Sequence, residues 1–478
     1  MVLSPRKAAT RELADRLAPE RERWIARNGY YYAEDYRYMR FLVPEGLRVL
    51  DLGCGTGGLL AALQPARGVG VDFSAKMIEI ARGSHPELEF VVGDVEDAAT
   101  IATLDGPFDV IVVSDTIGAV DDCQAMLANL HTLCHAGTRL IVAYYSRMWE
   151  PLLRLGEALG IQMPQTPQNW LSTEDICNLL ALSDFEMVKR EWRQLLPRRL
   201  FGLGTLINRY IAPFVIIRRA CLRNYIVARP RPPQAASTSR PSATVLVPCR
   251  NELGNIEAVV RRTPRFCDDM EILFVEGHSQ DGTLDEIHRV IAAYPEMDIK
   301  VLVEDGRGKG NAVRKGFAHA RGDALMILDA DLTVPPEMLP RFYEALASGR
   351  GEFINGTRLV YPMEKQAMRF LNHLANQAFS WLFSWLLNQR FTDTLCGTKV
   401  LSKWHYEQIA ANRGYFGDFD PFGDFDLIFG AAKLNLKITE IPIRYASRTY
   451  GETQISRFRH GWLLLRMVVF AFRKLKAF

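Results

Sequence analysis

The stretch LRVLDLGCGTGG at residues 47–58 combines an apolar run with a glycine-rich loop. Residues 47–50 predict a β-strand, because they are mostly aliphatic and end at a strong turn signal. Glycine adopts backbone conformations that other residues avoid, so the glycines that follow predict a tight strand-to-helix turn. Such a turn also lets a ligand approach the backbone closely.

The second half of the chain opens in the same way, with TVLV at 244–247 leading into PCRNE at 248–252. Short apolar runs recur after both stretches, and helix-length segments separate most of them. In the front half they lie at 68–71, 90–92, 110–113 and 140–143, and in the rear half at 272–275, 300–303 and 325–328. This alternation predicts an α/β protein with two mainly parallel sheets. Ligands of such sheets bind at the carboxyl ends of the strands.

The composition of the chain is that of a globular protein. Its 478 residues are 48% hydrophobic and 24% charged, which excludes wholesale disorder. The net charge of +3 argues against a polybasic nucleic-acid binder, so we expect no nucleic-acid partner. The 8 cysteines include no C-x-x-C pair, which favours reduced thiols in a cytoplasmic protein over a disulfide scaffold or zinc ribbon. The charged N-terminus does not resemble a secretory signal.

A proline-rich segment, RPRPPQAASTSRPSA at residues 229–243, divides the chain. Prolines lack an N–H donor and fix φ, and the small polar residues between them cannot build a core. We therefore predict a front domain at 1–228, a linker at 229–243 and a rear domain at 244–478.

The glycine loop alone is ambiguous, because Gly53, Gly55 and Gly58 also satisfy the G-x-G-x-x-G fingerprint of dinucleotide-binding proteins. Three carboxylates at predicted strand ends argue against that interpretation. Asp51 would repel a pyrophosphate but attract a cation, Asp72 is placed to accept hydrogen bonds from ribose hydroxyls, and Asp94 ends a third strand. An NAD-dependent oxidoreductase and a non-catalytic binding module remain the alternatives for this half.

Four motifs together resemble the class I S-adenosylmethionine-dependent methyltransferases, with a Rossmann-like sheet: DLGCGTG at 51–57, GVDFSAKMI at 70–78, GDV at 93–95 and FDVIVVSDT at 108–116. The resemblance implies that S-adenosylmethionine is the cofactor, with its methionine part near Gly53 and Gly55, its ribose on Asp72 and its adenine beside Asp94 and Val95. The residues so assigned to the cofactor site are Asp51, Gly53, Gly55, Gly57, Asp72, Asp94 and Val95.

The methyl acceptor is not identified by the sequence. Methyl transfer from a sulfonium mainly needs proximity and orientation, and a base only where the acceptor must lose a proton. Asp115 and His131 are candidate bases, although a structural role is favoured for each. Five tyrosines precede the first strand and suit either a lid or an ordinary packed helix: Tyr30, Tyr31, Tyr32, Tyr36 and Tyr38.

The rear half carries the pair Asp329 and Asp331, which directly follows the apolar run 325–328. Two carboxylates at a strand end offer hard oxygen ligands for Mg²⁺ or Mn²⁺ bound to a diphosphate. The stretch GRGKGN at 306–311 adds a glycine loop with a lysine, which suits contact with phosphate. Asp281 and Glu252 lie in the loops after two other predicted strands.

These motifs, with NGTR at 355–358, DTLCGTK at 393–399 and EIPIRY at 440–445, resemble the family 2 glycosyltransferases of GT-A fold, near the dolichyl- and polyprenyl-phosphate mannose synthases. The resemblance implies a nucleotide-sugar donor, UDP- or GDP-linked, and a lipid-phosphate or glycolipid acceptor. It places Glu252 and Asp281 at the nucleoside, Asp329 and Asp331 at the metal, and Lys309, Arg358 and Arg448 at phosphates. Glu276-Gly277 replaces the paired aspartates usual in the family, which leaves the nucleotide base open.

The expected reaction is an inverting in-line displacement in which the metal and the arginines stabilise the departing diphosphate. A lipid phosphate is already anionic and needs little base. A hydroxyl acceptor needs one, and Asp424 or Asp426 in the acidic loop 417–426 is our candidate.

Three apolar segments also carry basic or aromatic residues: 198–223, 379–387 and 457–476. None reaches the roughly 18–20 apolar residues of a membrane span. The last has aromatic and aliphatic bulk with several basic residues and no acid, as an interfacial helix on anionic lipid requires. We therefore expect a peripheral protein at the cytoplasmic face of a membrane.

Overall fold

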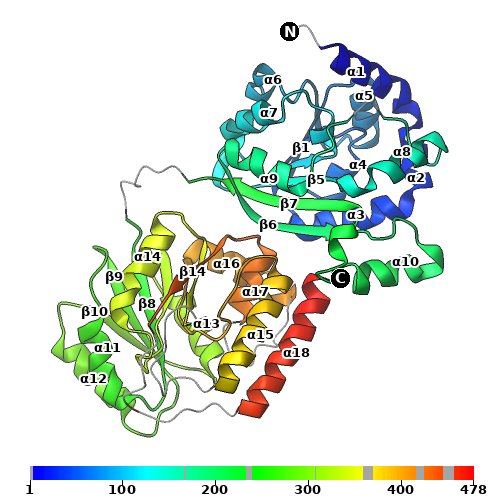
Figure 1. The fold of residues 1–478 in the computed structure, drawn as a ribbon. Coiled ribbons are helices and arrows are strands. Elements are labelled where there is room, and N and C mark those ends of the chain that lie inside the picture. Colours follow the sequence, from blue (N-terminus) through cyan, green and yellow to red (C-terminus); the bar gives the residue numbers. More distant parts are fainter. Residues whose placement is uncertain are drawn as a thin grey trace. The chain divides into compact units, whose positions relative to one another are not determined.

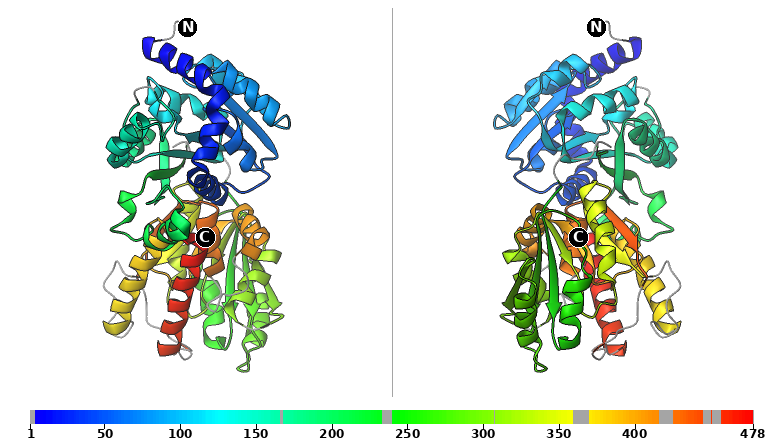
Figure 2. Two further views of the ribbon diagram at one scale, coloured as in Figure 1. Left: turned by 90° about the vertical axis from the view of Figure 1, so that its right-hand side faces the viewer. Right: turned by 90° about the vertical axis from the view of Figure 1, so that its left-hand side faces the viewer.

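The computed structural model describes residues 4–165, 168–232, 240–306, 308–358, 370–415, 425–444, 450 and 457–477. The chain forms two compact units: Met1–Arg231 with Lys476–Phe478, and Pro232–Leu475. Each unit is built on a mixed, mainly parallel sheet, with helices on both faces of the sheet (Figures 1 and 2). The α/β class predicted from the sequence, with two Rossmann-like sheets, is confirmed.

The first sheet has the strand order β3-β2-β1-β4-β5-β7-β6. Strands β1 to β5 are parallel, whereas β7 runs antiparallel to both β5 and β6. The bounds of the strands are β1 Arg48–Leu52, β2 Arg67–Asp72, β3 Glu89–Val92, β4 Phe108–Ser114, β5 Cys134–Tyr145, β6 Phe185–Arg193 and β7 Arg223–Pro230. The α-helices are α1 Pro5–Leu17, α2 Arg21–Arg27, α3 Gly29–Leu42, α4 Gly58–Ala62, α5 Ala75–Ser84, α6 Ala98–Ala102, α7 Cys123–Asn129, α8 Glu150–Ala158, α9 Thr173–Leu182 and α10 Leu203–Leu206.

The second sheet has the strand order β10-β9-β8-β11-β13-β12-β14. Only β13 runs antiparallel to its neighbours, β11 and β12. The bounds of the strands are β8 Ala243–Cys249, β9 Met270–Glu276, β10 Asp298–Val303, β11 Ala324–Ile327, β12 Phe353–Thr357, β13 Lys399–Ser402 and β14 Ile438–Pro442. The α-helices are α11 Ile256–Arg262, α12 Thr283–Ala293, α13 Lys309–His319, α14 Leu339–Ala347, α15 Phe370–Leu387, α16 Lys403–Ala411, α17 Phe425–Lys433 and α18 Arg457–Leu475.

Every strand predicted from an apolar run is present, and most of those runs are buried in the sheets, whereas the edge strands β3 and β10 each expose part of theirs. Leu50, Ile111 and Val142 are completely buried in the first sheet, and Val245 and Met326 in the second. The strands β6, β7 and β12 to β14 were not predicted from the sequence. The strand β7 also includes Arg229 and Pro230, which the sequence analysis had placed in the linker.

Both sheets have a topological switch point. The strand β1 lies between β2 and β4, and β8 lies between β9 and β11. The connections leave to opposite sides at these strands, so a crevice opens at their carboxyl ends, where ligands of open α/β sheets bind. The two quoted motif stretches, 47–58 and 244–252, each run into such a crevice.

Candidate functional sites

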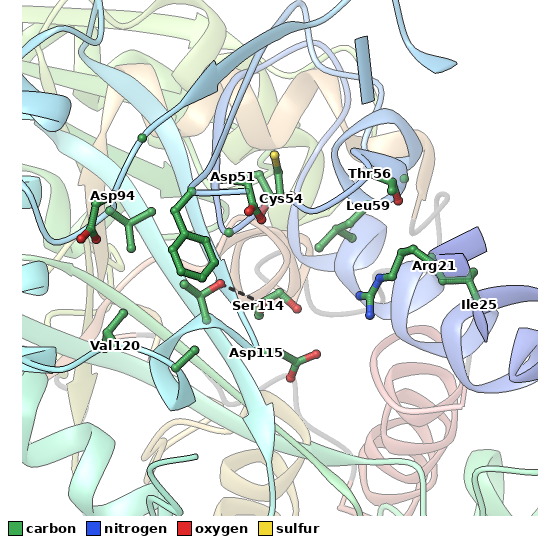
Figure 3. Close-up of a pocket in the computed structure, with 18 of the residues that line it drawn as sticks. Arg21, Ile25, Asp51, Cys54, Thr56, Leu59, Asp94, Ser114, Asp115 and Val120 are labelled. Atoms are coloured by element: carbon green, nitrogen blue, oxygen red, sulfur yellow. Dashed lines mark hydrogen bonds between the residues drawn. The ribbon is translucent and has the colours of Figure 1, made fainter. Parts of the chain in front are cut away.

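A cavity of about 230 Å³ lies at the carboxyl ends of β1, β2 and β4 (Figure 3). Of the residues predicted to bind the cofactor, the structure brings Asp51, Gly53, Asp72, Asp94 and Val95 to its wall. Gly55 and Gly57 are not among the lining residues. They shape the loop instead, with φ values of +54° and +81° that favour glycine.

Gly53 is the position where the loop tolerates no side chain. Its φ is +79°, and a Cβ atom there would lie 2.0 Å from Oγ1 of Thr116. That hydroxyl donates a hydrogen bond to the carbonyl of Leu52, at 2.6 Å. The glycine therefore allows the ends of β1 and β4 to meet beneath the cavity.

Asp72, the last residue of β2, holds the glycine loop in place. One carboxylate oxygen accepts a hydrogen bond from the backbone N–H of Gly55, at 2.9 Å, and the other from that of Ser74, at 2.9 Å. Ser74 caps α5 by accepting from the N–H of Met77. A carboxylate has about four acceptor positions, so Asp72 retains capacity for ligand hydroxyls.

Asp51 is a buried carboxylate in the cavity wall. Burial, together with the nearby charges of Asp72 and Asp35, raises the pKa of Asp51 to about 7. The cavity thus contains a carboxyl group that a cationic ligand would stabilise in its ionised form.

At the opposite end of the cavity, Asp94 pairs with Lys7 of α1. The lysine Nζ lies 2.5 Å from carboxylate oxygens of both Asp94 and Glu96. Burial opposes the charge of Lys7, but the two acids outweigh it and raise the lysine pKa. No local pattern predicts this contact, because Lys7 is 87 residues from Asp94.

Asp115 also lines the cavity, in a strained left-handed conformation with φ of +63°. The fully buried Arg223 forms ion pairs with Asp115 and with Asp35, and Tyr225 donates a hydrogen bond to Asp35. Burial raises the pKa of Asp115, although Arg223 opposes this. Of the two candidate bases, Asp115 thus faces the cavity. His131 does not line it, and instead contacts the carbonyl of Ser183.

Helices α2 and α3 contribute a wall that includes Tyr32, Tyr36 and Arg21, the last of which is labelled in Figure 3. Tyr31 and Tyr38 of α3 are buried in the core. Some tyrosines of the cluster therefore lie at the cavity, as a lid would require, whereas others pack in the core as in an ordinary helix. No local pattern identified Arg21, which the fold brings to the cavity from a separate helix.

In the second unit, the loops after β8 and β9 are joined by hydrogen bonds. Asp281 accepts from the backbone N–H groups of Leu253 and Thr283, at 3.3 and 3.1 Å. The N–H of Glu252 donates to the hydroxyl of Thr283, at 3.0 Å. Hydrogen bonding lowers the pKa of Asp281 despite the opposing effect of partial burial. The structure thus brings Glu252 and Asp281 together, as the predicted nucleoside site requires.

The pair Asp329 and Asp331 follows β11. Lys309 lies 2.6 Å from Asp329, and Asp331 accepts hydrogen bonds from the N–H and hydroxyl of Thr333, at 3.1 and 2.8 Å. Burial opposes ionisation of Asp329, but Lys309, with Lys399 and Arg358 further away, holds the pKa of that carboxyl below its usual value. Asp329 therefore lies near three cations.

The segment 393–399 passes directly beneath this pair. A Cβ atom at Gly397 would lie 1.8 Å from Oδ2 of Asp329. Arg358 makes a bidentate ion pair with the buried Asp393, at 2.6 and 2.8 Å, and Lys399 is completely buried. Asp393 and Lys399 belong to the motif at 393–399, but the motif alone did not predict these contacts.

The donor set at the acidic pair suits Mg²⁺. Among the described residues, no group of three or more His, Cys, Asp or Glu side chains is arranged to hold a metal. Mg²⁺ does not need one, because it binds through one or two carboxylates, substrate phosphates and water. Asp331, with Asp329 beside it, would supply those carboxylates.

Three further predicted residues have different outcomes. Asp426 lies on α17 and pairs with Arg314 and Arg413, at 3.4 and 3.3 Å, so its role as a base stays a prediction. Asp424 and Arg448 lie outside the described residues. At the position where the sequence departs from the family, Glu276 accepts from the backbone N–H groups of His278 and Ser279, and Gly277 lies against Glu304.

The two halves of the chain match two known families. Residues 244–406 match the family described as glycosyl transferase family 2, and residues 13–190 match a methyltransferase domain family. The dolichol-phosphate mannosyltransferase of Saccharomyces cerevisiae is 35% identical over 233 residues, which are 45% of this chain and 80% of the yeast protein.

Two further proteins are similar to this chain, one a sugar transferase and the other a solved methyltransferase structure. The undecaprenyl-phosphate 4-deoxy-4-formamido-L-arabinose transferase of Erwinia tasmaniensis is 28% identical over 219 residues, 45% of this chain and 62% of that protein. Among solved structures, an S-adenosylmethionine-dependent methyltransferase of Thermotoga maritima matches 46% of this chain and 98% of its own, with 22% identity and a TM-score of 0.35.

Proposed function

Since the chain belongs to the family 2 glycosyltransferases through its rear unit and carries a class I methyltransferase domain in front, we propose that it is a bifunctional enzyme of lipid-linked saccharides. The rear unit transfers a sugar from a nucleotide donor to a polyprenyl-phosphate or glycolipid acceptor. The front unit transfers a methyl group from S-adenosylmethionine to an acceptor in the same pathway.

The observation that carries the sugar-transfer proposal is the acidic pair among three cations at the switch point of the second sheet. A nucleoside diphosphate bound to Mg²⁺ is an anion held by a cation, so carboxylates and basic side chains must meet at one place. Asp331 and Asp329 supply the metal ligands there. Lys309 is the cation placed closest to them.

In the proposed reaction, Asp331 and Asp329 would hold Mg²⁺ or Mn²⁺, which would supply a Lewis acid to stabilise negative charge on the departing diphosphate. Glu252 and Asp281 hold the nucleoside, and Lys309, Arg358 and Arg448 neutralise phosphate oxygens. The acceptor oxygen attacks the anomeric carbon from the opposite side, which inverts its configuration. A phosphate acceptor attacks without a base, whereas a hydroxyl acceptor passes its proton to Asp424 or Asp426.

In the front unit, Asp72 would hold the ribose of the cofactor, and Asp94 with Val95 would border its adenine. Its methionine part lies along the loop of Gly53 and Gly55. Asp115, Tyr32 and Tyr36 line the same cavity and would border the reacting methyl group. Orientation of the two reactants in the cavity would supply most of the rate enhancement for such a displacement.

The raised pKa of Asp51 predicts a pH dependence of cofactor binding. The ionised carboxylate attracts a sulfonium cation and the protonated form does not. Affinity for S-adenosylmethionine is therefore expected to weaken below the Asp51 pKa of about 7, by up to about tenfold per pH unit. Calorimetric titration between roughly pH 6 and pH 8 tests this. An Asp51→Asn variant should show a flat profile, and a pH-dependent wild type with an equally pH-dependent variant would refute the assignment.

We also propose attachment to an anionic membrane surface through α18. Leu464, Met467 and Ala471 are buried, whereas Trp462, Leu465, Val469, Arg466 and Arg473 are exposed on another face of the helix. Figure 1 shows α18 beside α15, and their rings stack at Trp385 and Phe472. Within the described part of the chain, no helix is both long and apolar enough to span a bilayer. Apolar side chains flanked by arginines suit the interface of anionic lipid.

Replacing Trp462, Leu465 and Val469 with serine is expected to weaken vesicle binding about a hundredfold, since each side chain loses an apolar contact with lipid. Sedimentation of the full chain with phosphatidylglycerol vesicles measures this. Trp404→Ser removes a similarly exposed tryptophan from α16 and serves as the control. Equal sedimentation of the triple variant and the wild type would exclude α18 as the attachment site.

A further inference from the structure

One segment of the first unit exposes an unusual amount of apolar surface. It follows β6 and precedes β7, and α10 lies within it (Figure 1). Phe201 and Ile216 are 112% and 92% exposed, so almost nothing covers either side chain. The exposed apolar residues of the segment are Leu200, Phe201, Leu203, Leu206, Tyr210, Ile211, Phe214 and Ile216.

The backbone holds Phe201 outward at an energetic cost. Leu200 and Phe201 both lie in the left-handed region, with φ of 44° and 54°. Such a conformation costs about 1 kcal/mol or more for a residue other than glycine. The gain is not internal packing, because the ring of Phe201 is fully exposed. Packing within the first unit therefore does not explain this conformation, whereas binding of the exposed ring to a ligand would.

The segment is anchored to the unit and is not a loose loop. The buried Asn208 accepts from the N–H of Leu196, at 2.9 Å, and donates to the carbonyl of Leu196 and the hydroxyl of Tyr30, at 2.7 and 3.2 Å. Ala212 is buried in a small cluster with Trp192 and Cys221. The exposed side chains are thus presented from a fixed base.

The charged residues of the segment itself are all basic. Arg198, Arg199 and Arg219 are exposed at its two ends, and the sequence contains no Asp or Glu between Glu191 and Glu252. Basic residues beside an apolar surface are attracted to anionic lipid, by about 1 kcal/mol each. The helix α8 differs in this respect, because it exposes Leu152 and Leu155 but also carries Glu150 and Glu157.

The shape of the surface favours lipid over a protein partner. A protein would need a matching pocket for each projecting side chain, whereas the interfacial region of a bilayer accepts projecting aromatic and aliphatic groups without one. We propose that residues 198–219 are a second lipid-docking surface, separate from α18, which inserts Phe201 and Ile216 into the interface of an anionic membrane.

This surface connects to the wall of the cofactor cavity. Gln194, just before the segment, donates to the carbonyl of Tyr31, at 3.0 Å, and Asn208 contacts Tyr30. Both tyrosines belong to α3, which lines the cavity with Tyr32 and Tyr36. Docking therefore brings the methyltransferase unit to a lipid-borne acceptor, a consequence that rests on the proposed methyl transfer, although the docking itself does not.

The test uses the full chain and vesicles of equimolar phosphatidylglycerol and phosphatidylcholine. A Phe201→Ser/Ile216→Ser variant is expected to bind at least about tenfold more weakly than the wild type, and Leu152→Ser/Leu155→Ser should bind as the wild type does. Arg198→Gln/Arg199→Gln/Arg219→Gln should weaken binding to these vesicles but not to pure phosphatidylcholine. Since α18 contributes separately, the effect of each variant should persist when the α18 triple substitution is also present.

Unchanged S-adenosylhomocysteine binding by the variants will show that the front unit remains folded. Vesicle binding needs no turnover, so a failure to detect methylated product leaves this result intact. Wild-type affinity of the Phe201→Ser/Ile216→Ser variant would overturn the proposal. So would a loss of self-association in that variant without any change in vesicle binding, since the surface would then bind protein.

Discussion

Replacing Asp331 with alanine is expected to lower sugar transfer by about a thousandfold or more, since it removes a carboxylate ligand of the metal that stabilises the leaving diphosphate. The loss should appear in kcat with a nucleotide sugar and polyprenyl phosphate at saturating Mg²⁺. It should be accompanied by a weaker response of the rate to added metal.

Thr333→Ala is the matched control for that experiment. It removes the hydroxyl that donates to Asp331 but leaves the carboxylate, so only a severalfold loss is expected. Binding of S-adenosylmethionine should stay unchanged in both variants, because it takes place in the other unit. A turnover of Asp331→Ala equal to that of the wild type would remove this residue from the mechanism.

Replacing Asp72 with alanine is expected to weaken S-adenosylmethionine binding by at least about a hundredfold. The variant loses both hydrogen bonds that the ribose hydroxyls would donate to the charged carboxylate. Methyl transfer should disappear at ordinary cofactor concentrations. Part of the effect arises within the protein, since Asp72 also holds the N–H groups of Gly55 and Ser74.

Ser74→Ala tests whether a disturbance of the neighbouring cap of α5 is enough to weaken binding, since it keeps the backbone N–H that Asp72 holds. It removes the hydroxyl that caps α5 on the same loop and contacts no predicted ligand atom, so it should cost about 1 kcal/mol in stability. Cofactor affinity should fall only severalfold. If Ser74→Ala weakened binding as much as Asp72→Ala, the loop and not the ribose contact would explain the Asp72 result.

The sequence predicted those parts of the sites that depend on short stretches of chain. Asp51 and Asp72 lie at the carboxyl ends of apolar strands, and Asp329 and Asp331 come shortly after one, so their position at the sheet edge follows from local pattern alone. The same is true of Gly53, where a left-handed φ and a close neighbour leave room only for glycine.

The partners of these residues were not predictable, because they come from distant elements. Lys7 lies on the first helix, and Arg223 lies on a strand that pairs antiparallel at the far side of the sheet. Buried ion pairs such as Arg223 with Asp35 span 188 residues and leave no periodic signal. The apolar character of 198–219 was visible, but its strained, outward-facing conformation was not.

The two units both place carboxylates where a donor would bind, but they differ in how those carboxylates are ionised. Each places carboxylates at the switch point of a mainly parallel sheet, and each balances them differently. In the first unit Asp51 remains a carboxyl group with a raised pKa, which suits a cationic donor. In the second unit Asp329 is held ionised by nearby cations, which suits a metal and a diphosphate.

The most direct test of two independent donor sites is calorimetric titration of the full chain with S-adenosylmethionine, NADH and Mg²⁺ with GDP or UDP. The account predicts binding of S-adenosylmethionine but not NADH, lost in Asp72→Ala and retained in Asp331→Ala. It also predicts that GDP or UDP binds in the presence of Mg²⁺, and that this binding is lost in Asp331→Ala and retained in Asp72→Ala. Binding of NADH without S-adenosylmethionine, or loss of both ligands in either single variant, would contradict it.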